Sequence, residues 1–450
     1  MQLRHPIPRN TRQLLLIALL LAVQTLCSAL PGVHAQEAIA TSCTISEDIT
    51  GDETWSPEIC ATYLVTRSFT IGFDGRLTIL PGTIVRFDPK TGLVVEGMLV
   101  ARGTPERPIT FDSSQPDPRP GDWTGVRFAS NSVDTRFDDA GNYLDGSMMQ
   151  YVTIAHGGGE QLLDPEANLA LTSTTVYIDH VTVTNSATAG IHVESDDPLR
   201  ITNNVITDNE GSGMYVSTNK LYFDPPIPSI IDGNTVSRNK SNGIWVLASR
   251  DTVISHNTVE ENEYGGMKVD GLPLFPAYIT ITNNLIADNF FSEDDRLTCG
   301  GGIHGLRSIF SIESNIITGN TADTGGGVCT TSSAAQMHDN LFAENRAGNA
   351  NSIYIADAFD TTITGNDILS AGCMPQVELA NDSNAAIDAT DNYWGVLDGS
   401  AVEALILHFT DDRDLGLVRY APVRYAPVRE QQHTPVHCVF VPHVARGGEH

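Results

Sequence analysis

The chain has 450 residues, with 55 acidic and 26 basic side chains and a formal net charge of −29 at pH 7. This charge excludes nucleic acid as a main partner, because a nucleic-acid-binding surface needs clustered positive charge. It equally disfavours binding to anionic membrane surfaces. The length allows two or three ordinary domains, or one long repeat structure.

Residues 1–35 have the features of a signal peptide. A basic start with three arginines precedes an apolar run, Leu14 to Val23, that is too short to span a bilayer comfortably. A small-x-small cleavage pattern then ends at Ala35. We therefore expect a secreted protein, extracellular or at the cell surface, with no membrane span. Its first part, 36–62, is expected to form an N-terminal segment or cap.

Six cysteines follow the predicted leader, and an even number in an exported chain favours disulfides. Their spacing does not resemble a zinc site. Six cysteines allow fifteen pairings, so we choose the pairs by proximity in the sequence. Free thiols are the alternative if the protein is exported into a reducing niche. The predicted pairs are Cys43–Cys60, Cys299–Cys329 and Cys373–Cys438.

Residues 63–147 contain short strand-like segments separated by turn residues, and we expect them to form the first, less regular turns of a repeat structure. Residues 148–395 repeat clearly. Segments of one type recur, such as ITNNVITDN at 201–209 and ITNNLIADN at 281–289. Each segment carries two asparagines five residues apart, and the segments follow one another at steps of 23 to 31 residues.

These asparagines form two columns when the segments are aligned. We expect each amide to bond to the amides of the turns before and after it, as in the side-chain ladders of stacked strands. His180 and Gln150 are expected to extend the first column towards the N-terminus. The first column is Asn204, Asn234, Asn257, Asn284, Asn315, Asn340, Asn366 and Asn392, and the second is Asn209, Asn239, Asn262, Asn289, Asn320 and Asn345.

The repeat length suits one turn of a β-helix, in which three short strands and their turns use about this many residues. Helical repeats are disfavoured because the segments lack a 3.6-residue period and are rich in Asn, Gly, Thr and β-branched residues. An apolar residue three positions before the first asparagine should point inward and stack on its equivalents. These inward residues are Ile201, Ile231, Ile254, Ile281, Ile312, Met337 and Ile363.

The repeat ends near residue 395, and we expect 396–450 to form a C-terminal cap and tail. A short helix over 401–408 is expected to cover the last turn, because the open end of a solenoid exposes strand edges and core. Residues 418–429, VRYAPVRYAPVR, contain a direct five-residue duplication. Their prolines favour an extended conformation.

Three parts of the chain together resemble a known family. These are the opening segments PGTIVRF, GMLVARGT, PITF and GDWTGVRF, the asparagine repeats, and the closing NYWG at 392–395. They are similar to bacterial secreted right-handed parallel β-helix repeat proteins of the pectin-lyase-like group, over residues 63 to about 428. The resemblance implies an all-β fold: a single right-handed parallel β-helix solenoid with a short C-terminal cap. The group includes lyases, glycoside hydrolases, epimerases, adhesins and surface proteins without known activity.

A further column follows the second asparagine of each repeat. A glycine or serine begins a strand there, an apolar residue that should point inward comes next, and the residue after that should point outward. Rings are frequent at this outward position, where an ordinary surface carries Thr, Ser or charged residues. We name the column the aromatic row, and its members are His192, Tyr215, Trp245, Lys268, His304, Cys329 and Tyr354.

The aromatic row has two interpretations. In one, sugar rings stack in a groove along the row, with polar neighbours that fix their orientation. In the other, the rings pack on one another and stiffen the sheet. The predicted carbohydrate-binding residues are His192, Tyr215, Trp245, Arg307 and Tyr354.

The turn that carries His304 also contains an insertion, because thirteen residues lead from Asn289 to the next strand glycine and other turns use four to seven. Long loops on a solenoid often wall a binding site, and this one contributes the acids at 293–295. Lys268, Asp270 and His304 lie near it and are the candidate catalytic residues. Lyase chemistry would use Lys268 or His304 as the base, with Arg307 or a bound Ca²⁺ to neutralise a sugar carboxylate.

The sequence thus predicts an extracellular β-helix that binds a polysaccharide or a cell-surface glycan along the aromatic row. A polysaccharide lyase or glycoside hydrolase on the same face is the first alternative, and a structural or adhesive surface protein is the second. No cofactor is established, and Ca²⁺ is the one candidate. We expect a monomer. The sequence does not identify the polysaccharide.

Overall fold

The computed structural model describes residues 42–138, 141–160, 166–218, 227–248, 251–271, 278–291, 298–370 and 376–429. All of them belong to one unit, Thr41–His450. The predicted signal peptide lies outside these ranges. So do the acidic residues 293–295 of the insertion, and Cys373 and Cys438.

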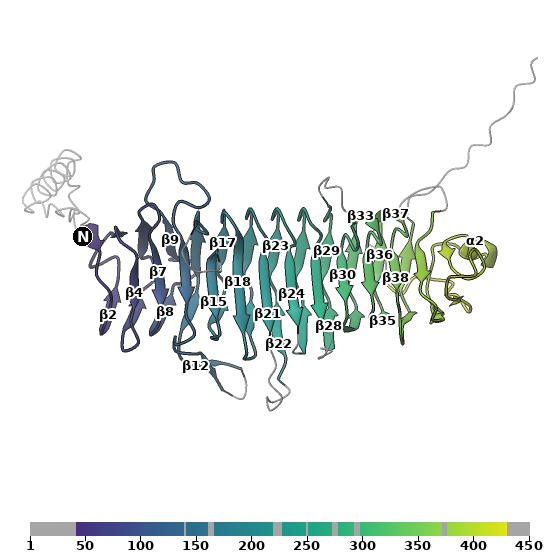
Figure 1. The fold of residues 1–450 in the computed structure, drawn as a ribbon, viewed down its shortest axis with the longest axis horizontal. Coiled ribbons are helices and arrows are strands. Elements are labelled where there is room, and N and C mark those ends of the chain that lie inside the picture. Colours follow the sequence, from purple (N-terminus) through teal and green to yellow (C-terminus); the bar gives the residue numbers. More distant parts are fainter. Residues whose placement is uncertain are drawn as a thin grey trace, which may run out of the picture. The chain divides into compact units, whose positions relative to one another are not determined.

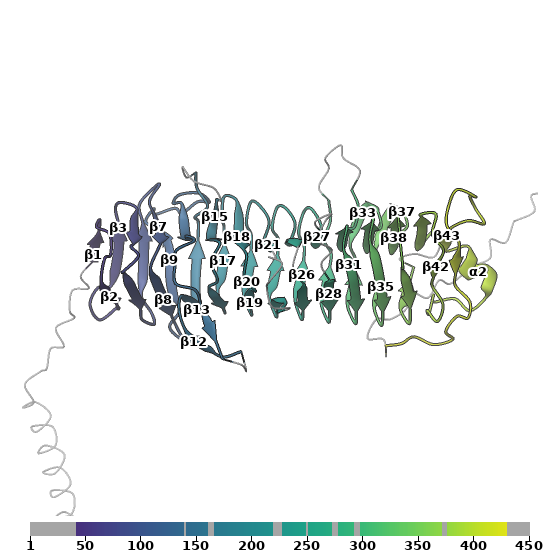
Figure 2. The ribbon, with the colours of Figure 1, turned by 60° about the horizontal axis from the view of Figure 1, so that its bottom comes forward.

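The chain winds through three long parallel sheets, and almost every turn adds one strand to each (Figure 1). Within the described residues, sheets A and B each contain thirteen strands and sheet C contains fourteen. Figure 2 shows the stack after rotation about its long axis, with the strands of successive turns side by side. This is the architecture of a parallel β-helix, as the sequence predicts.

The strands of sheet A, in their order along the stack, are β1 (Ser42–Ile45), β3 (Thr62–Val65), β6 (Ile84–Phe87), β9 (Ile109–Ser113), β14 (Val152–Ala155), β17 (Thr182–Thr184), β20 (Val205–Thr207), β23 (Thr235–Ser237), β26 (Thr258–Glu260), β29 (Leu285–Ala287), β32 (Ile316–Thr318), β36 (Leu341–Ala343) and β40 (Asp367–Leu369). Those of sheet B are β4 (Phe69–Ile71), β7 (Gly92–Val95), β10 (Gly125–Phe128), β15 (Ala167–Thr172), β18 (Ala189–Ser195), β21 (Met214–Thr218), β24 (Ile244–Ala248), β27 (Met267–Gly271), β30 (Ile303–Leu306), β34 (Val328–Thr331), β38 (Ile353–Ala356), β41 (Leu379–Asp382) and β43 (Ile406–Leu407).

The strands of sheet C are β2 (Asp52–Trp55), β5 (Arg76–Ile79), β8 (Met98–Arg102), β13 (Met148–Gln150), β16 (Tyr177–Asp179), β19 (Arg200–Thr202), β22 (Ser229–Asp232), β25 (Thr252–Ser255), β28 (Tyr278–Thr282), β31 (Ile309–Glu313), β35 (Ala334–His338), β39 (Thr362–Thr364), β42 (Ile387–Asp388) and β44 (Val418–Arg419). Two small sheets pair β11 (Arg136–Phe137) with β12 (Tyr143–Asp145), and β33 (Thr321–Thr324) with β37 (Arg346–Asn349).

The core runs along the inside of the three sheets. The predicted inward column from Ile201 to Ile363 is confirmed, because each member pairs directly with its equivalent on the next turn. These side chains are 0 to 1% exposed. Full burial of each such side chain stabilises the fold by about 1.5–3 kcal/mol. The same alternation turns every second residue of sheet B outward, and this is where the aromatic row lies.

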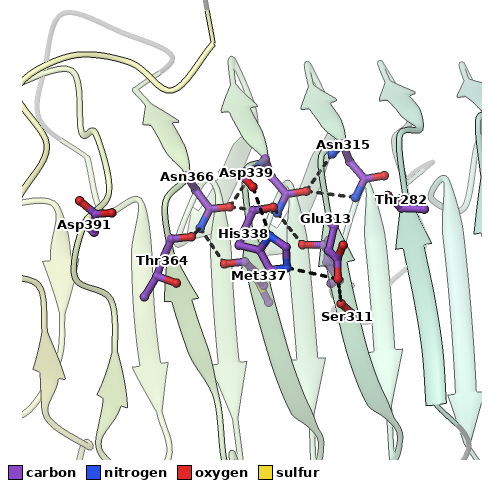
Figure 3. Close-up of polar contacts among 12 residues, drawn as sticks. Thr282, Ser311, Glu313, Asn315, Met337, His338, Asp339, Thr364, Asn366 and Asp391 are labelled. Atoms are coloured by element: carbon purple, nitrogen blue, oxygen red, sulfur yellow. Dashed lines mark hydrogen bonds and ion pairs between the residues drawn. The ribbon is translucent and has the colours of Figure 1, made fainter.

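The asparagine ladders are also confirmed. Asn257 is typical: its Oδ1 accepts hydrogen bonds from both the backbone and the side-chain nitrogen of Asn234, at 2.9 Å each. Its own amide group donates to Asn284 Oδ1 at 3.0 Å and to the carbonyl of Ile231 at 2.9 Å. Figure 3 shows Asn315 and Asn366 with the same pattern. Each buried amide is therefore satisfied by the turns on both sides.

The first ladder does not extend to His180 and Gln150 as expected. The backbone N–H of Val181 donates to Asn204 Oδ1 at 2.8 Å, so Val181 occupies the ladder position of its turn. His180 lies one residue earlier, at the left-handed corner (φ 54°) that Asn203 takes on the next turn (φ 57°). Gln150 pairs with the residue before His180. The alignment was wrong here because valine occupies the ladder position of this turn, and the polar residue nearest to it lies at the corner one position earlier.

Both ends of the stack are closed by specific contacts. At the N-terminal end, the predicted Cys43–Cys60 disulfide is present. At the C-terminal end, α2 (Gly399–Glu403) begins at Asp398, whose carboxylate accepts from the backbone of Ser400. This helix is shorter than the one expected over 401–408, because Ile406–Leu407 instead forms β43 on the open edge of sheet B.

Candidate functional site

The aromatic row lies on the outer face of sheet B. Strand pairing places its seven members on consecutive strands from β18 to β38, each directly beside the next. Neighbouring members are therefore about 4.8 Å apart along the stack. The first five, His192 to His304, form the continuous polar and aromatic part of the row, and Cys329 separates them from Tyr354.

A glycine precedes each strand from β21 to β30 because the second asparagine ladder lies directly beneath. A Cβ built on Gly243 would lie 2.7 Å from Asn262 Nδ2 and 2.7 Å from the carbonyl oxygen of Gly266. No side chain fits at that distance. The strand backbone therefore packs directly against the asparagine ladder. This contact fixes the position of each strand and of the aromatic-row residue that it carries.

Rings of the row pack on one another along the stack. The centroids of His192 and Tyr215 are 4.6 Å apart, and Tyr215 meets Trp245 edge to face at 5.0 Å. Lys268 Nζ lies 4.3 Å from the centroid of the Trp245 ring, in cation–π geometry. The faces of these rings are therefore partly covered by their neighbours, and a ligand lying along the row would contact their outer edges.

A polar centre surrounds Asp270, two residues after Lys268 on β27. Trp245 Nε1 donates to Asp270 Oδ2 at 3.0 Å, and Lys268 Nζ lies 3.5 Å from the same oxygen. The Asp270 side chain is only 10% exposed. Its second oxygen, Oδ1, is buried and has no hydrogen-bond partner among the described residues. A buried carboxylate oxygen normally has a partner, so Oδ1 differs in this respect from most buried polar atoms of the described residues.

His304 follows Lys268 on the next turn and completes the centre. Burial lowers its pKa, an effect that nearby Asp270 opposes and Lys268 reinforces. The imidazole is consequently neutral at pH 7 and can accept a proton or a hydrogen bond. Lys268, Asp270 and His304, the three predicted catalytic residues, thus lie together.

A second outward column on sheet B contains Glu194 and Asp270. Strand pairing places them three turns apart, about 14 Å by the strand spacing. The two carboxyl groups of a glycosidase lie at most about 9.5 Å apart, so these two cannot act as such a pair. Glu194 instead approaches His192, with Oε1 3.2 Å from Nε2.

The remaining predicted residues lie at the margins of the site. Arg307 follows β30 in a left-handed conformation (φ 52°), and its Nε donates to the carbonyl of Gly271 at 3.3 Å. This contact holds the exposed guanidinium beside the Asp270 turn. Tyr354 donates its hydroxyl to Asp382, and burial together with that carboxylate raises the pKa of the phenol. Tyr354 therefore stays protonated and lies outside the continuous part of the row.

The predicted disulfide Cys299–Cys329 joins the end of the insertion to the row. Cys329 is fully buried and so contributes no contact surface. Thr298 reinforces the attachment, because its backbone nitrogen and hydroxyl both donate to Asp323, at 2.8 and 2.9 Å. The end of the insertion is therefore held beside the row.

The sequence model for the family described as "Right handed beta helix region" matches residues 167–342 and 229–393, which together exceed half of the chain. The chain belongs to the right-handed β-helix family. No curated protein sequence matches it.

Several solved structures resemble this β-helix. The A-module of the mannuronan C-5 epimerase AlgE4 of Azotobacter vinelandii is 14% identical, with a TM-score of 0.36, covering 68% of this chain and 97% of that one. Pectate lyase Pel9A is 11% identical, with a TM-score of 0.29 and coverage of 85% and 80%. Tailspike protein 2 of Escherichia coli O157:H7 bacteriophage CAB120 is 13% identical, with a TM-score of 0.26 and coverage of 72% and 39%. At this level of identity the likeness concerns the fold.

Across the described ranges, no three His, Cys, Asp or Glu side chains converge in a way that could hold a metal ion. The Ca²⁺ suggested by the sequence therefore stays a prediction. Among the same residues, none of the helices has the length and apolar character that crossing a membrane requires.

Sequence reasoning missed two contributors to this face of the β-helix. The bond between Trp245 and Asp270 joins residues 25 positions apart, and only the lateral offset between columns brings them together. Tyr264 and Phe291 pack edge to face with centroids 6.1 Å apart and pair through an antiparallel bridge at the start of the insertion. The signal for the second pair was present, since both rings lie between a second asparagine and the following glycine.

Proposed function

We propose that this β-helix is an exported protein that binds a polysaccharide along the aromatic row, with the strongest contacts at Lys268, Asp270 and His304. The observation that carries the proposal is the cluster of Trp245, Lys268 and His304 around the Asp270 carboxylate on the outer face of sheet B. The two disulfides agree with export, because disulfides persist in oxidising compartments.

The shape of the row suits a linear polymer better than a small molecule. From His192 to His304 the row covers four strand spacings, about 19 Å, without interruption. Ring edges along this length supply apolar contact, and the polar centre supplies orientation, which is the combination that ligand sites commonly use. Lys268 and Arg307 add positive charge to this face of an acidic protein, which favours a glycan with carboxylate groups.

The test is affinity electrophoresis and a glycan array with the full-length protein. Asp270→Ala and Trp245→Ala should each weaken binding tenfold or more, because both remove central contacts. Tyr278→Ala is the matched control, since Tyr278 is an aromatic residue on sheet C that is 61% exposed. Equal binding by all four proteins, or no glycan bound by the wild type, would remove the proposal and leave a structural or adhesive solenoid.

A catalytic role on the same face is the second candidate, and the neutral His304 beside Lys268 favours it. His304 could take a proton from a sugar carbon next to a carboxylate, as a lyase requires, with Lys268 and Arg307 neutralising the carboxylate. A hydrolase would instead need a second carboxyl group near Asp270. A panel of uronate polymers with Ca²⁺, assayed for new ultraviolet absorbance and for reducing ends, decides this. No product from any polymer would leave binding alone.

A further inference from the structure

The C-terminal strap, residues 420–429, runs back along the outside of sheet A towards earlier turns. It begins on the last turn, where the backbone N–H of Asp391 donates to the carbonyl of Pro422 at 2.7 Å and that of Arg424 donates to Asn392 at 2.9 Å. It ends one turn earlier, where the backbone N–H groups of Val428 and Arg429 donate to the two oxygens of Asp367, at 2.7 and 3.2 Å. The strap therefore has a defined direction along the stack.

The turns next in that direction carry an apolar patch on the outer face of sheet A. Leu341, Ile316 and Leu285 pair directly with one another across neighbouring strands, and Leu341 pairs with Asp367. We name these three residues the leucine patch. Their burial increases towards the strap, since Leu285 and Ile316 are half-buried, whereas Leu341 is 5% and Asp367 0% exposed.

The equivalent positions farther along sheet A are mostly polar. The column on the turns that precede the leucine patch contains, in order away from it, Thr258, Thr235, Val205, Thr182 and Thr153. The change from threonine to leucine and isoleucine thus occurs on the three turns that follow the end of the strap. Three consecutive outward apolar residues form a continuous patch, unlike the single Val205, and such a patch is the kind of surface that another segment covers.

We infer that the leucine patch is the docking surface for the chain's own terminal segment, residues 430–444. This segment follows the strap directly and contains an apolar stretch, Val436 to Val441, that includes Phe440. Its prolines at 435 and 442 disfavour a helix, and in a strand-like chain Val436 and Phe440 share one side. The inference is independent of the aromatic row, which lies on sheet B.

The geometry allows this docking without strain. From Asp367 to Leu285 the patch covers three strand spacings, about 14 Å. The eleven residues from Arg429 to Phe440 can span up to about 36 Å. Because the strap already holds Arg429 at Asp367, the segment is present at a high effective concentration, which an unattached partner would have to exceed. A second copy of the chain is the competing occupant and becomes an outcome of the test.

The test uses the full-length chain with a photoreactive residue, p-benzoylphenylalanine, in place of Ile316. Irradiation followed by peptide mass mapping should cross-link this site to residues 430–444. The matched control carries the same group at Val205, which is in the same outward column and 40% exposed, and it should not cross-link to that segment. Mixing ¹⁵N-labelled and unlabelled protein shows whether both peptides come from one chain.

Phe440→Ser in the cross-linking variant should reduce the yield roughly tenfold or more, which is the factor given by the loss of one buried aromatic side chain. Three results would overturn the inference. These are equal cross-linking from positions 316 and 205, a yield that Phe440→Ser leaves unchanged, and cross-links only between different chains, which would assign the patch to self-association.

Discussion

Replacing Trp245 by phenylalanine tests whether the polar centre is held together as the structure indicates. The change keeps a ring in the row but removes the Nε1–H that donates to Asp270 Oδ2 at 3.0 Å. Asp270 is 10% exposed, so water replaces this donor poorly. The carboxylate then depends on Lys268, at 3.5 Å, as its one remaining partner among the described residues.

The size of the effect follows from the kind of bond. A hydrogen bond to a charged group contributes about 1.5–3 kcal/mol, and the weaker cation–π contact of Lys268 with a phenyl ring adds a smaller loss. Asp270→Asn separately removes the charge while it keeps the shape. We therefore expect the double-mutant cycle of Trp245→Phe and Asp270→Asn to give a coupling of about 2 kcal/mol.

The measurement is urea unfolding followed by far-ultraviolet circular dichroism, with the free energy of unfolding compared among the wild type, the two single variants and the double variant. Tyr278→Phe controls for the loss of a polar atom from an exposed aromatic residue and should change the free energy by less than about 0.5 kcal/mol. A coupling near zero would refute the reasoning, because the two side chains would then contribute independently.

Three further predictions concern the scaffold. Asn262→Ala should lower the free energy of unfolding by about 3 kcal/mol, because it leaves buried ladder groups unpaired on both neighbouring turns. Asn131→Ala is the control and should have little effect, because Asn131 is exposed. Equal urea midpoints for the wild type and Asn262→Ala would show that the ladder does not contribute to stability. Burial raises the pKa of Glu378 above its ordinary 4.5, so the folded state holds this proton more tightly. The stability of the wild type relative to Glu378→Gln should then fall as the pH rises from about 4.5 through the raised pKa, and parallel pH profiles would argue against this. Non-reducing peptide mapping should recover Cys373–Cys438, because the bond from Val428 to Asp367 leaves both cysteines on short tethers to one point; free thiols at these positions would disprove the pairing.

Much of the architecture could be predicted because a β-helix repeats its local rules. The spacing of Asn257 and Asn284 identified both the turn length and the ladder, and alternation along each strand then placed Trp245 beside Lys268. The position of His180 was predicted wrongly, because its turn has a valine at the ladder position and a polar residue at the corner before it. Histidine and asparagine both occupy that corner.

The polar contacts of the candidate site required the three-dimensional structure. Alignment of the repeats identifies the residues that are neighbours along a column. The hydrogen bond from Trp245 to Asp270, however, joins two different columns. The burial of Asp270 Oδ1 likewise becomes visible only in three dimensions. Contacts of residues beside other corners were equally hidden. His338, for example, lies between Glu313 and Asp339, with distances of 3.2 and 3.4 Å to its two ring nitrogens (Figure 3).

The ladder also makes the number of turns adjustable. The hydrogen bonds of Asn257 go to residues of the two adjacent turns. If the 27 residues from 258 to 284 were excised, Asn257 would take the place of Asn284 and bond to Asn315. The asparagine ladder would stay continuous after this deletion. The outer surface would change, because Lys268 and Asp270 would be removed and Trp245 would lie beside His304. Gain or loss of whole modules can therefore redraw the recognition surface of such a protein while its interior stays the same.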